Sequence, residues 1–441
     1  MAAVVRAIAE SAADTRARTV TESWCLWPAG RQYHRAGMKT VLIVGAGRYQ
    51  RAVIRRAREL GLRVVAVDRN PDAPGLAEAD IGRVVDFADP GAVLAAVADL
   101  EIDGVTTVQA ERAVPMVARL AEELGVPGIG AGTARLLTHK VSMRRRLAEA
   151  GVPQPRFTTL RASEDAARAS AEVPFPAVLK PGAGSGQHGV FRVESAAEVA
   201  SHLDEALAVS PGEEAILEEY VDGIEMNGIV VVRQGRVLLA ALGDRLRPSG
   251  IGFGVSWIHL YPPHVEGDSL AASTRVAVDT ARTLGLETGI AFPQLIATTD
   301  GRVLVVECAA RIGGMMAELL EHALGIDLLE IQLRLALGDE VTEAMVRPRF
   351  ERPTAIRFLT AQPGHLRAGR VTRVGPLGPV LASPGVVDAS IYSVVGETIR
   401  PVQVISDRRG YVIATGETRE QALQRADAAA ALVEIEVEEV R

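Results

Sequence analysis

Cysteine, lysine and long apolar runs are all scarce in this chain of 441 residues. Cys25 and Cys308 are the only cysteines, so a disulfide framework and a cysteine-based metal site are both excluded, and a reducing compartment is expected. No apolar run approaches the roughly 20 residues that a transmembrane helix needs. The net charge of −7 argues against a nucleic-acid-binding surface. We therefore expect a cytoplasmic protein of roughly two to four domains, with neither a membrane nor a nucleic acid as partner.

Lysine is the most informative of these absences. It occurs only at positions 39, 140 and 180, whereas the other 45 basic residues are arginine. A coding bias that favours arginine explains the imbalance, and a lysine retained against it is a candidate for a task that arginine cannot perform. A compact ammonium group enters a phosphate pocket in which a planar guanidinium would clash. Lys39 adjoins the start of a predicted strand and can be incidental, so Lys140 and Lys180 are the candidates.

The first part of the chain divides into an extension and an α/β unit. Residues 1–37 show no sustained periodicity and no apolar core typical of a secretory signal, so we expect an N-terminal extension without fixed structure. Strands are predicted at 40–44 and 62–68, with a helix at 50–60 between them. The glycines at 45 and 47, with Asp68, resemble a dinucleotide-binding fingerprint, but Gln50 replaces the third glycine. NAD binding is therefore the alternative, and a structural α/β domain is the preferred interpretation.

A glycine-rich loop follows the second candidate lysine. Lys180 ends a strand predicted at 176–180, and residues 182–189 contain four glycines. Such a loop exposes backbone amides that can close over anionic oxygens. It lacks the P-loop spacing, because its lysine precedes the glycines, and an ordinary hairpin loop is the alternative. The next predicted strand, 215–221, carries adjacent acids at 218 and 219, which are costly to bury unless a ligand or partner compensates them.

Residues 294–314 read as two strands joined at Asp300-Gly301, which is a strong hairpin signal. Alternation along the second strand places Glu307, Ala309 and Arg311 on one face. A surface salt bridge between Glu307 and Arg311 is the simple explanation of these charges. Two further features lie between the loop and this hairpin. The glycine-rich stretch at 244–254 is a candidate mobile flap. His259 is a lone histidine, and such a residue is more often structural than catalytic.

Taken in order, these segments from Met38 to the end resemble the ATP-grasp superfamily. The resemblance implies a Rossmann-like pre-ATP-grasp domain at 38–133 and a two-subdomain ATP-grasp fold at 134–345, with subdomains at about 140–220 and 221–345. A C-terminal lid-like α+β domain would follow at 346–441. The implied ligands are ATP and Mg²⁺, with Mn²⁺ as an alternative metal.

The same resemblance implies roles for individual residues. Metal binding would fall to Glu307 and Gln294, the transferring phosphate to Arg311, and a position near the reacting groups to His259. Substrate binding would involve Gly313, Gly314 and Arg245. ATP binding would involve a larger set: Lys140, Lys180, Gly184, Ser185, Gly186, Gln187, His188, Glu218, Glu219, Val221 and Glu225.

Within the superfamily the chain is most similar to the L-amino acid ligases, which share the pattern Glu-x-x-x-Arg-x-Gly-Gly found here at 307–314. The resemblance implies a carboxylate–amine ligase that forms an amide through an acylphosphate and releases ADP and phosphate. Its substrates would be amino acids or similar small carboxylates and amines. Such ligases often dimerise, so a homodimer is one option, but the sequence does not fix the oligomeric state. The sequence departs from the family pattern at Gln294, Ala309 and Ser256. Two alternatives therefore stay open: a purine-pathway type of enzyme that uses bicarbonate or formate, and a catalytically silent ATP-binding protein.

Overall fold

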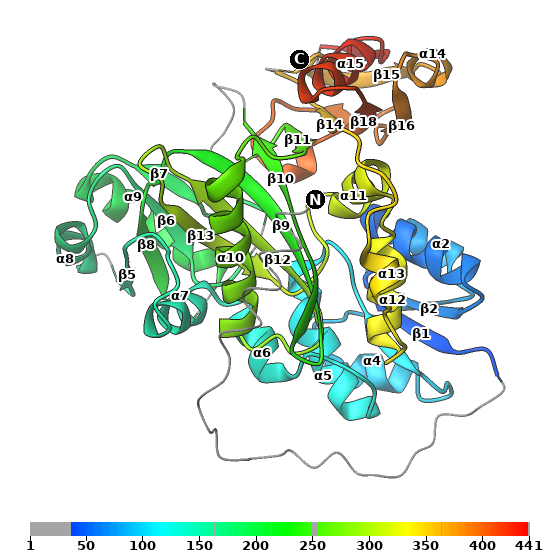
Figure 1. Cartoon of the computed structure of the whole chain (residues 1–441), viewed down its shortest axis with the longest axis horizontal. Coiled ribbons are helices and arrows are strands. Elements are labelled where there is room, and N and C mark those ends of the chain that lie inside the picture. The colour runs from blue at the N-terminus through cyan, green and yellow to red at the C-terminus, as the bar shows by residue number, and fades with distance from the viewer. Residues whose placement is uncertain are drawn as a thin grey trace.

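The computed structural model describes residues 37–439, except 163, 185, 211, 213, 248–254 and 363. Ser185, most of the candidate flap and nearly all of the predicted N-terminal extension lie outside the described residues. The predicted fold class is confirmed, because one parallel sheet is followed by three antiparallel or largely antiparallel sheets with helices packed on them (Figure 1). None of the helices in the described part has the length and apolar character needed to cross a bilayer.

The N-terminal unit is a parallel sheet in the order β3-β2-β1-β4. Every residue of β1 is buried, since helices cover both faces of the sheet. The elements of this unit are β1 (Thr40–Val44), η1 (Arg48–Gln50), α2 (Arg51–Glu59), β2 (Arg63–Asp68), α3 (Pro74–Glu78), β3 (Ile81–Val84), α4 (Pro90–Ala96), β4 (Gly104–Thr106), η2 (Glu111–Ala113) and α5 (Val114–Leu124).

The glycine turn after β1 is filled from within the protein. Gln50 is buried and donates a hydrogen bond to the Val108 carbonyl at 2.6 Å. A Cβ added at Gly47 would lie 3.2 Å from the Gln50 side-chain oxygen. The carboxylate of Asp68 accepts a hydrogen bond from the Ala46 amide at 2.8 Å. Gln50 and Asp68 are thus hydrogen-bonded to the backbone of the protein itself, which favours the structural interpretation of this turn.

The second unit is an antiparallel sheet in the order β5-β8-β6-β7. Its core consists of apolar residues from the sheet and from two helices that lie on it, including Leu179, Leu203 and Leu217. The elements are α6 (Ala131–Leu136), α7 (Lys140–Glu149), β5 (Phe157–Leu160), α8 (Asp165–Glu172), β6 (Ala177–Pro181), β7 (Phe191–Val193), α9 (Ala196–Val209) and β8 (Ala215–Glu219).

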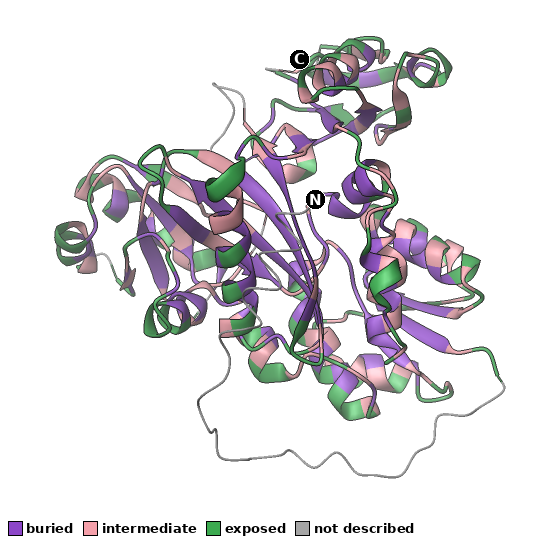
Figure 2. Cartoon of the chain, viewed as in Figure 1, coloured by how far each residue is buried: buried purple, intermediate pink, exposed green. Residues whose placement is uncertain are grey.

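An eight-stranded sheet in the order β13-β12-β9-β10-β11-β14-β18-β16 forms the body of the molecule. Its long central strands are largely buried, as Figure 2 shows. The elements up to 346 are β9 (Ile224–Arg233), β10 (Arg236–Leu246), β11 (Ile258–Tyr261), α10 (Gly267–Thr283), β12 (Gly289–Ala297), β13 (Val303–Ala309), α11 (Met316–Leu324), α12 (Leu328–Ala336) and α13 (Glu343–Val346).

The C-terminal elements extend this sheet and add a small sheet in the order β17-β15-β19. β14, β16 and β18 pair into the large sheet, so backbone hydrogen bonding continues across the predicted domain boundary at 345–346. The position of that domain boundary stays a prediction. The elements are β14 (Thr354–Leu359), β15 (Gly369–Val374), α14 (Gly378–Leu381), β16 (Val386–Ile391), β17 (Thr398–Ile399), η3 (Ile405–Asp407), β18 (Gly410–Thr415), α15 (Arg419–Ala430) and β19 (Ile435–Glu438).

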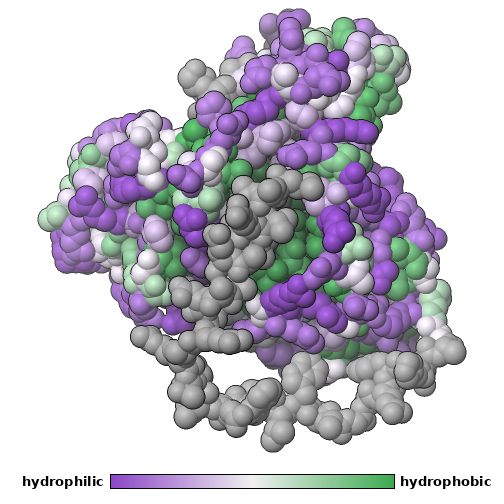
Figure 3. Space-filling model, in the orientation of Figure 1, coloured by the Kyte–Doolittle hydropathy of each residue, from purple (hydrophilic) through white to green (hydrophobic). Residues whose placement is uncertain are grey.

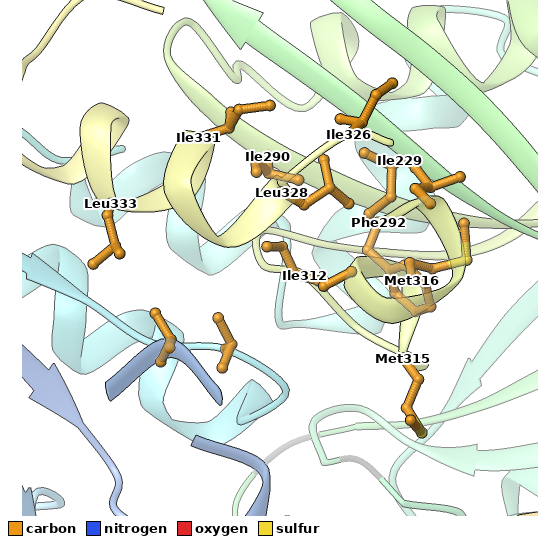
Figure 4. Packing of buried hydrophobic residues seen from close by; sticks show 14 of the residues in the cluster. Ile229, Ile290, Phe292, Ile312, Met315, Met316, Ile326, Leu328, Ile331 and Leu333 are labelled. Carbon is orange, nitrogen blue, oxygen red and sulfur yellow. The ribbon is translucent and has the colours of Figure 1, made fainter. Parts of the chain in front are cut away.

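One apolar cluster joins the units. Phe292, Ile312 and Met316 from the body belong to the same buried cluster as Leu333 of α12 (Figure 4), and this cluster also contains buried residues of β1 and β2. Hydrophilic residues cover most of the outer units on the face shown in Figure 3, whereas apolar surface is visible mainly near its middle. The N-terminal unit is therefore held against the body by a continuous core, as well as by an ion pair between Arg56 and Asp327 at 2.7 Å.

Candidate active site

A cleft opens between the β5–β8 unit and the large sheet, where it meets the start of β9 at Glu225, the end of β10 at Arg245, and β12 and β13 at Gln294 and Glu307. Apolar side chains line part of it, including Val178, Ile296 and Val306, and charged or polar groups line the rest. Every described residue of the predicted ATP-binding set lines this cleft, and so do the predicted metal ligands and Arg245. These residues are Lys140, Lys180, Gly184, Gly186, Gln187, His188, Glu218, Glu219, Val221, Glu225, Arg245, Gln294 and Glu307.

The two candidate lysines reach the cleft from different elements. Lys140 begins α7 and places Nζ 2.7 Å from the Gly184 carbonyl and 3.1 Å from Glu307 Oε1. Lys180 lies on β6 and donates to Glu218 Oε2 at 2.5 Å. Both ammonium groups are mostly enclosed, so their charge is screened less than on the surface. Two positive charges therefore face the same narrow space, as binding of a polyphosphate requires.

Glu218 is held by two cations rather than left open to a ligand. Its carboxylate is almost fully buried and accepts from Lys180 and from Arg144 Nε at 2.7 Å. Burial alone would raise the pKa of Glu218, but Arg144 and Lys180 outweigh it and hold the pKa at about 2. Glu218 therefore stays charged and fixes Lys180 in the cleft, while its predicted contact with ATP stays a prediction.

Arg144 was missed by the sequence analysis. Its fully buried guanidinium joins Glu218 of β8 to the carbonyls of Val305 and Val306 on β13, at 3.0 and 2.6 Å. It lies one helical turn after Lys140, on the same face of α7. That spacing was the available signal, but Arg144 heads a run of three arginines that looks like an exposed helix surface.

The glycine-rich loop connects β6 to β7 beside Lys140. Gly186 and Gly189 have φ of +76° and +66°, in the left-handed region that L residues rarely adopt. The amide of Lys140 donates to the Gly182 carbonyl at 2.7 Å, which ties the loop to the start of α7. The loop thus brings its backbone over the cleft, and it is not a simple hairpin turn.

Glu307 and Gln294 face each other across the β12–β13 ladder. A register shift at Val306 interrupts the ladder just before Glu307, whereas Glu307 and Ala309 stay in regular register with Gln294 and Phe292. Burial alone would raise the pKa of Glu307, but Lys140, Lys180 and Arg311 outweigh it, so the pKa is lowered and the group is ionised. The described residues contain no group of three or more His, Cys, Asp or Glu suited to a metal.

These residues still fit magnesium, although they offer fewer acidic ligands than the family pattern does. Mg²⁺ is usually held through one or two carboxylates, with water and substrate phosphates as its other ligands. Glu307 supplies one carboxylate and Gln294 one amide oxygen, whereas Ala309 and Ser256 supply no further acid. These residues therefore suit a phosphate-bound ion better than an independent metal site.

Arg311 lies beyond the end of β13 and is paired with an acid from the N-terminal unit. Its guanidinium contacts Glu111 Oε2 at 2.8 Å, so no simple salt bridge with Glu307 explains it. A Cβ at Gly313 would lie 1.9 Å from Arg311 Nη1, so only glycine leaves room for the guanidinium there. Burial raises the pKa of Glu111 despite the neighbouring Arg311. Glu111 was also missed by the sequence analysis, because its partner is 200 positions away.

His259 is buried on β11, outside the lining of the cleft. Its Nε2 lies 3.1 Å from the Ser256 hydroxyl, and a Cβ at Gly314 would lie 3.2 Å from its ring. Burial lowers the pKa of His259 well below its usual value, and the charges of Arg408 and Arg245 lower it further. The ring is therefore neutral near pH 7, which suits orientation through hydrogen bonds better than service as a cation.

Arg408, from the C-terminal elements, contacts Ser256 beside His259. Its buried guanidinium donates to both the carbonyl and the hydroxyl of Ser256 at 2.7 Å, and it stacks on Phe358 at 3.7 Å from the ring centroid. Burial lowers its pKa to about 10, so it stays charged at neutral pH. The position at which the family pattern has an acid is thus occupied by a serine that binds an arginine.

A larger cavity of about 980 Å³ lies on the other side of the glycine-rich loop. It shares Gly184, Gly186 and His188 with the cleft and is also lined by Glu111. The loop therefore separates two spaces. One is lined by the predicted ATP-binding residues, and the other is lined in part by Glu111, which pairs with Arg311.

Comparisons with known proteins match nearly the whole described chain. Residues 54–128 match the family model "ATP-grasp N-terminal domain", and residues 139–344 match "Carbamoyl-phosphate synthase L chain, ATP binding domain". Residues 357–438 match "L-amino acid ligase C-terminal domain 2". The chain belongs to the ATP-grasp superfamily of ligases. The predicted superfamily is thus confirmed, and its matched models follow one another in the order that the sequence analysis expected.

Individual ATP-grasp relatives extend this result. The formate-dependent phosphoribosylglycinamide formyltransferase of Ignicoccus hospitalis is 28% identical over 422 residues, which cover 89% of this chain and 95% of that protein. Carnosine synthase 1 of Gallus gallus is 28% identical over 337 residues, 70% of this chain and 36% of that protein. The solved structure of an L-amino acid ligase from Bacillus licheniformis has a TM-score of 0.79 at 22% identity and covers 91% of this chain and 99% of that one, a likeness of fold.

Proposed function

We propose that this ATP-grasp protein is a carboxylate–amine ligase that activates a carboxylate with ATP and joins it to an amine as an amide. The observation that carries the proposal is the shared cleft of Lys140, Lys180 and Glu307 beside the glycine-rich loop. Arg311 does not line this cleft but is close enough to Glu307 for its charge to help lower the pKa of that carboxylate. The match of residues 357–438 to the L-amino acid ligase C-terminal model supports amino acids or amino-acid-like metabolites as substrates.

In the proposed reaction, a carboxylate oxygen attacks the γ-phosphorus of ATP, the bond to the β-phosphate oxygen breaks, and ADP leaves. The amine nitrogen then attacks the acyl carbon, phosphate leaves with the bonding electrons, and the nitrogen loses a proton. Phosphoryl transfer depends mainly on positioning and charge neutralisation. Lys140 and Lys180 would neutralise the nucleotide phosphates. Glu307 and Gln294 would hold Mg²⁺, which supplies positive charge at the phosphates.

Arg311 would bind the transferring phosphate or the acylphosphate, because a planar guanidinium can donate two parallel hydrogen bonds. Glu111 fixes its orientation, and Gly313 gives it space. The neutral His259 would orient a substrate group through a hydrogen bond. The ATP cleft and the larger cavity meet at Gly184, so we propose that the carboxylate and amine enter through the larger cavity.

The test is release of ADP and phosphate across a matrix of amino-acid pairs, with mass spectrometry of the products. We expect turnover that requires both a carboxylate and an amine, with one amide formed for each ADP. ATP binding without phosphate release for any pair would instead identify a catalytically silent nucleotide-binding protein. Gln294 and Ala309 leave room for that outcome, because they provide fewer acidic metal ligands than the family pattern does.

A second candidate is favoured by the formate-dependent relative, which aligns over almost its full length. In that case formate or bicarbonate would be the activated carboxylate. Adding each anion to the same assay separates the two functions. Stimulation of phosphate release by formate or bicarbonate, without any amino-acid carboxylate, would support the second candidate and contradict the first.

A further inference from the structure

A separate cavity, here called the junction cavity, lies where the N-terminal unit, the β9–β10 turn and α12 meet. Its volume is about 240 Å³, and it shares no lining residue with the ATP cleft. Pockets for drug-sized ligands usually exceed about 300 Å³, so the junction cavity suits a smaller metabolite. Val117 and Leu335 contribute apolar walls, whereas Arg233 and Gln332 contribute polar groups.

Arg233 brings an uncompensated charge to this cavity. It ends β9 and is half-buried, and its guanidinium makes no ion pair or hydrogen bond with any residue in the described part of the chain. The acid in the same lining, Asp339, is already bound to Lys39 at 2.5 Å. A partly desolvated guanidinium favours a carboxylate, which it can bind through two parallel hydrogen bonds.

Gln332 supplies the second polar feature. Its Nε2 donates to the hydroxyl of the buried Thr106 at 2.9 Å, which fixes the amide group. The Oε1 atom is buried and accepts no hydrogen bond from the described residues. Buried acceptors are nearly always paired in native proteins, so an unpaired one calls for a donor from elsewhere. An ammonium or hydroxyl group on a ligand would provide that donor.

We propose that the junction cavity binds a small carboxylate that carries an amino or hydroxyl group and a short apolar side chain. The carboxylate binds Arg233, the N–H or O–H donates to Gln332, and the apolar part packs against Val117 and Leu335. Because these residues come from β9, α5 and α12, the ligand bridges the N-terminal unit and the body. This site does not depend on the proposed ligase activity, since none of its residues lines the ATP cleft.

The experiment is isothermal titration calorimetry of the full chain without ATP. The probes are L-valine, 2-hydroxyisovalerate, isovalerate and isobutylamine, which differ only in the groups that the proposal assigns. We expect L-valine and 2-hydroxyisovalerate to bind, isovalerate to bind about tenfold more weakly, and isobutylamine not to bind. Arg233→Ala should weaken L-valine binding at least about tenfold, because a charge-assisted hydrogen bond is lost.

Two further variants make the test specific. Gln332→Leu should weaken valine binding to about the level at which isovalerate binds the wild type. Arg236→Ala, on the exposed start of β10, should leave L-valine binding unchanged. The proposal is overturned if none of the four probes binds, or if Arg233→Ala binds L-valine like the wild type.

Discussion

Glu307 is the residue on which nucleotide chemistry should depend most strongly. It offers the one carboxylate opposite Gln294 and also pairs with Lys140. We expect Glu307→Gln to lower the rate of ADP and phosphate release at least about 100-fold, because charge stabilisation at the transferring phosphate is lost. The measurement is a coupled ADP assay. Asp300→Asn, in the exposed turn of the same hairpin, should retain wild-type rates, and equal losses in both variants would contradict this role.

Glu218 should matter for stability as well as for the site. Removing one partner of a buried ion pair typically costs about 3–5 kcal/mol, so we expect Glu218→Gln to lower the urea midpoint clearly at pH 7. Glu214→Gln should change it little, because its arginine partners are mostly exposed.

The pH dependence of this effect has a definite sign. The pKa of Glu218 is depressed to about 2 in the folded protein, so its stabilising contribution is fully present above the unfolded-state pKa. It is lost as the pH falls through the range from about 4.5 towards 2. The difference in urea midpoint between wild type and Glu218→Gln should therefore be constant from pH 7 to 5 and shrink below pH 4.5. A difference that grows on acidification would contradict this assignment.

At the scale of elements, the glycine-rich loop depends on positive φ. Gly189 has φ of +66°, and a Cβ there would lie 2.8 Å from Val209 on α9. We expect Gly189→Ala to displace the loop and to raise the KM for ATP about tenfold or more, with a smaller loss in kcat. Gly132→Ala is the matched control, because nothing lies within 4 Å of a Cβ at Gly132 in α6. An unchanged KM would show that this loop does not contact the nucleotide.

Most elements follow directly from local sequence, but their ends and irregularities do not. The predicted hairpin of β12 and β13 is present, with its turn at the predicted Asp300-Gly301. The register shift beside Gln294 and the end of β13 before Arg311 were not predicted. Alternation in the sequence shows which residues of a strand are apolar. A bulge instead depends on the contacts that the neighbouring strand and α7 make at that position. Arg144 binds the carbonyls of Val305 and Val306 at this irregularity.

At the scale of the whole molecule, Arg408 should couple the C-terminal elements to the reaction site. It donates to Ser256 next to His259, so its loss should loosen the contact between these elements and β11. We expect Arg408→Ala to admit water and to raise amine-independent phosphate release relative to amide formation, because an exposed acylphosphate hydrolyses. The ratio of phosphate to amide measures this effect. Arg400→Ala, at an exposed position, should keep the ratio of the wild type, and an unchanged ratio in Arg408→Ala would contradict the coupling.

The sequence by itself, through its resemblance to a known superfamily, identified the superfamily and the order of the units. Scarce lysines, a glycine-rich loop and paired acids, which are visible as local patterns, indicated candidate residues of the cleft. Only the tertiary structure decided how the charges are paired. Glu307 pairs with Lys140, Arg311 with Glu111, and Glu218 with both Lys180 and Arg144. These partners are distant in sequence, so many ion pairs are possible from the sequence alone. A buried charge is costly unless it is paired, and the packing of the units decides which opposite charge lies beside it.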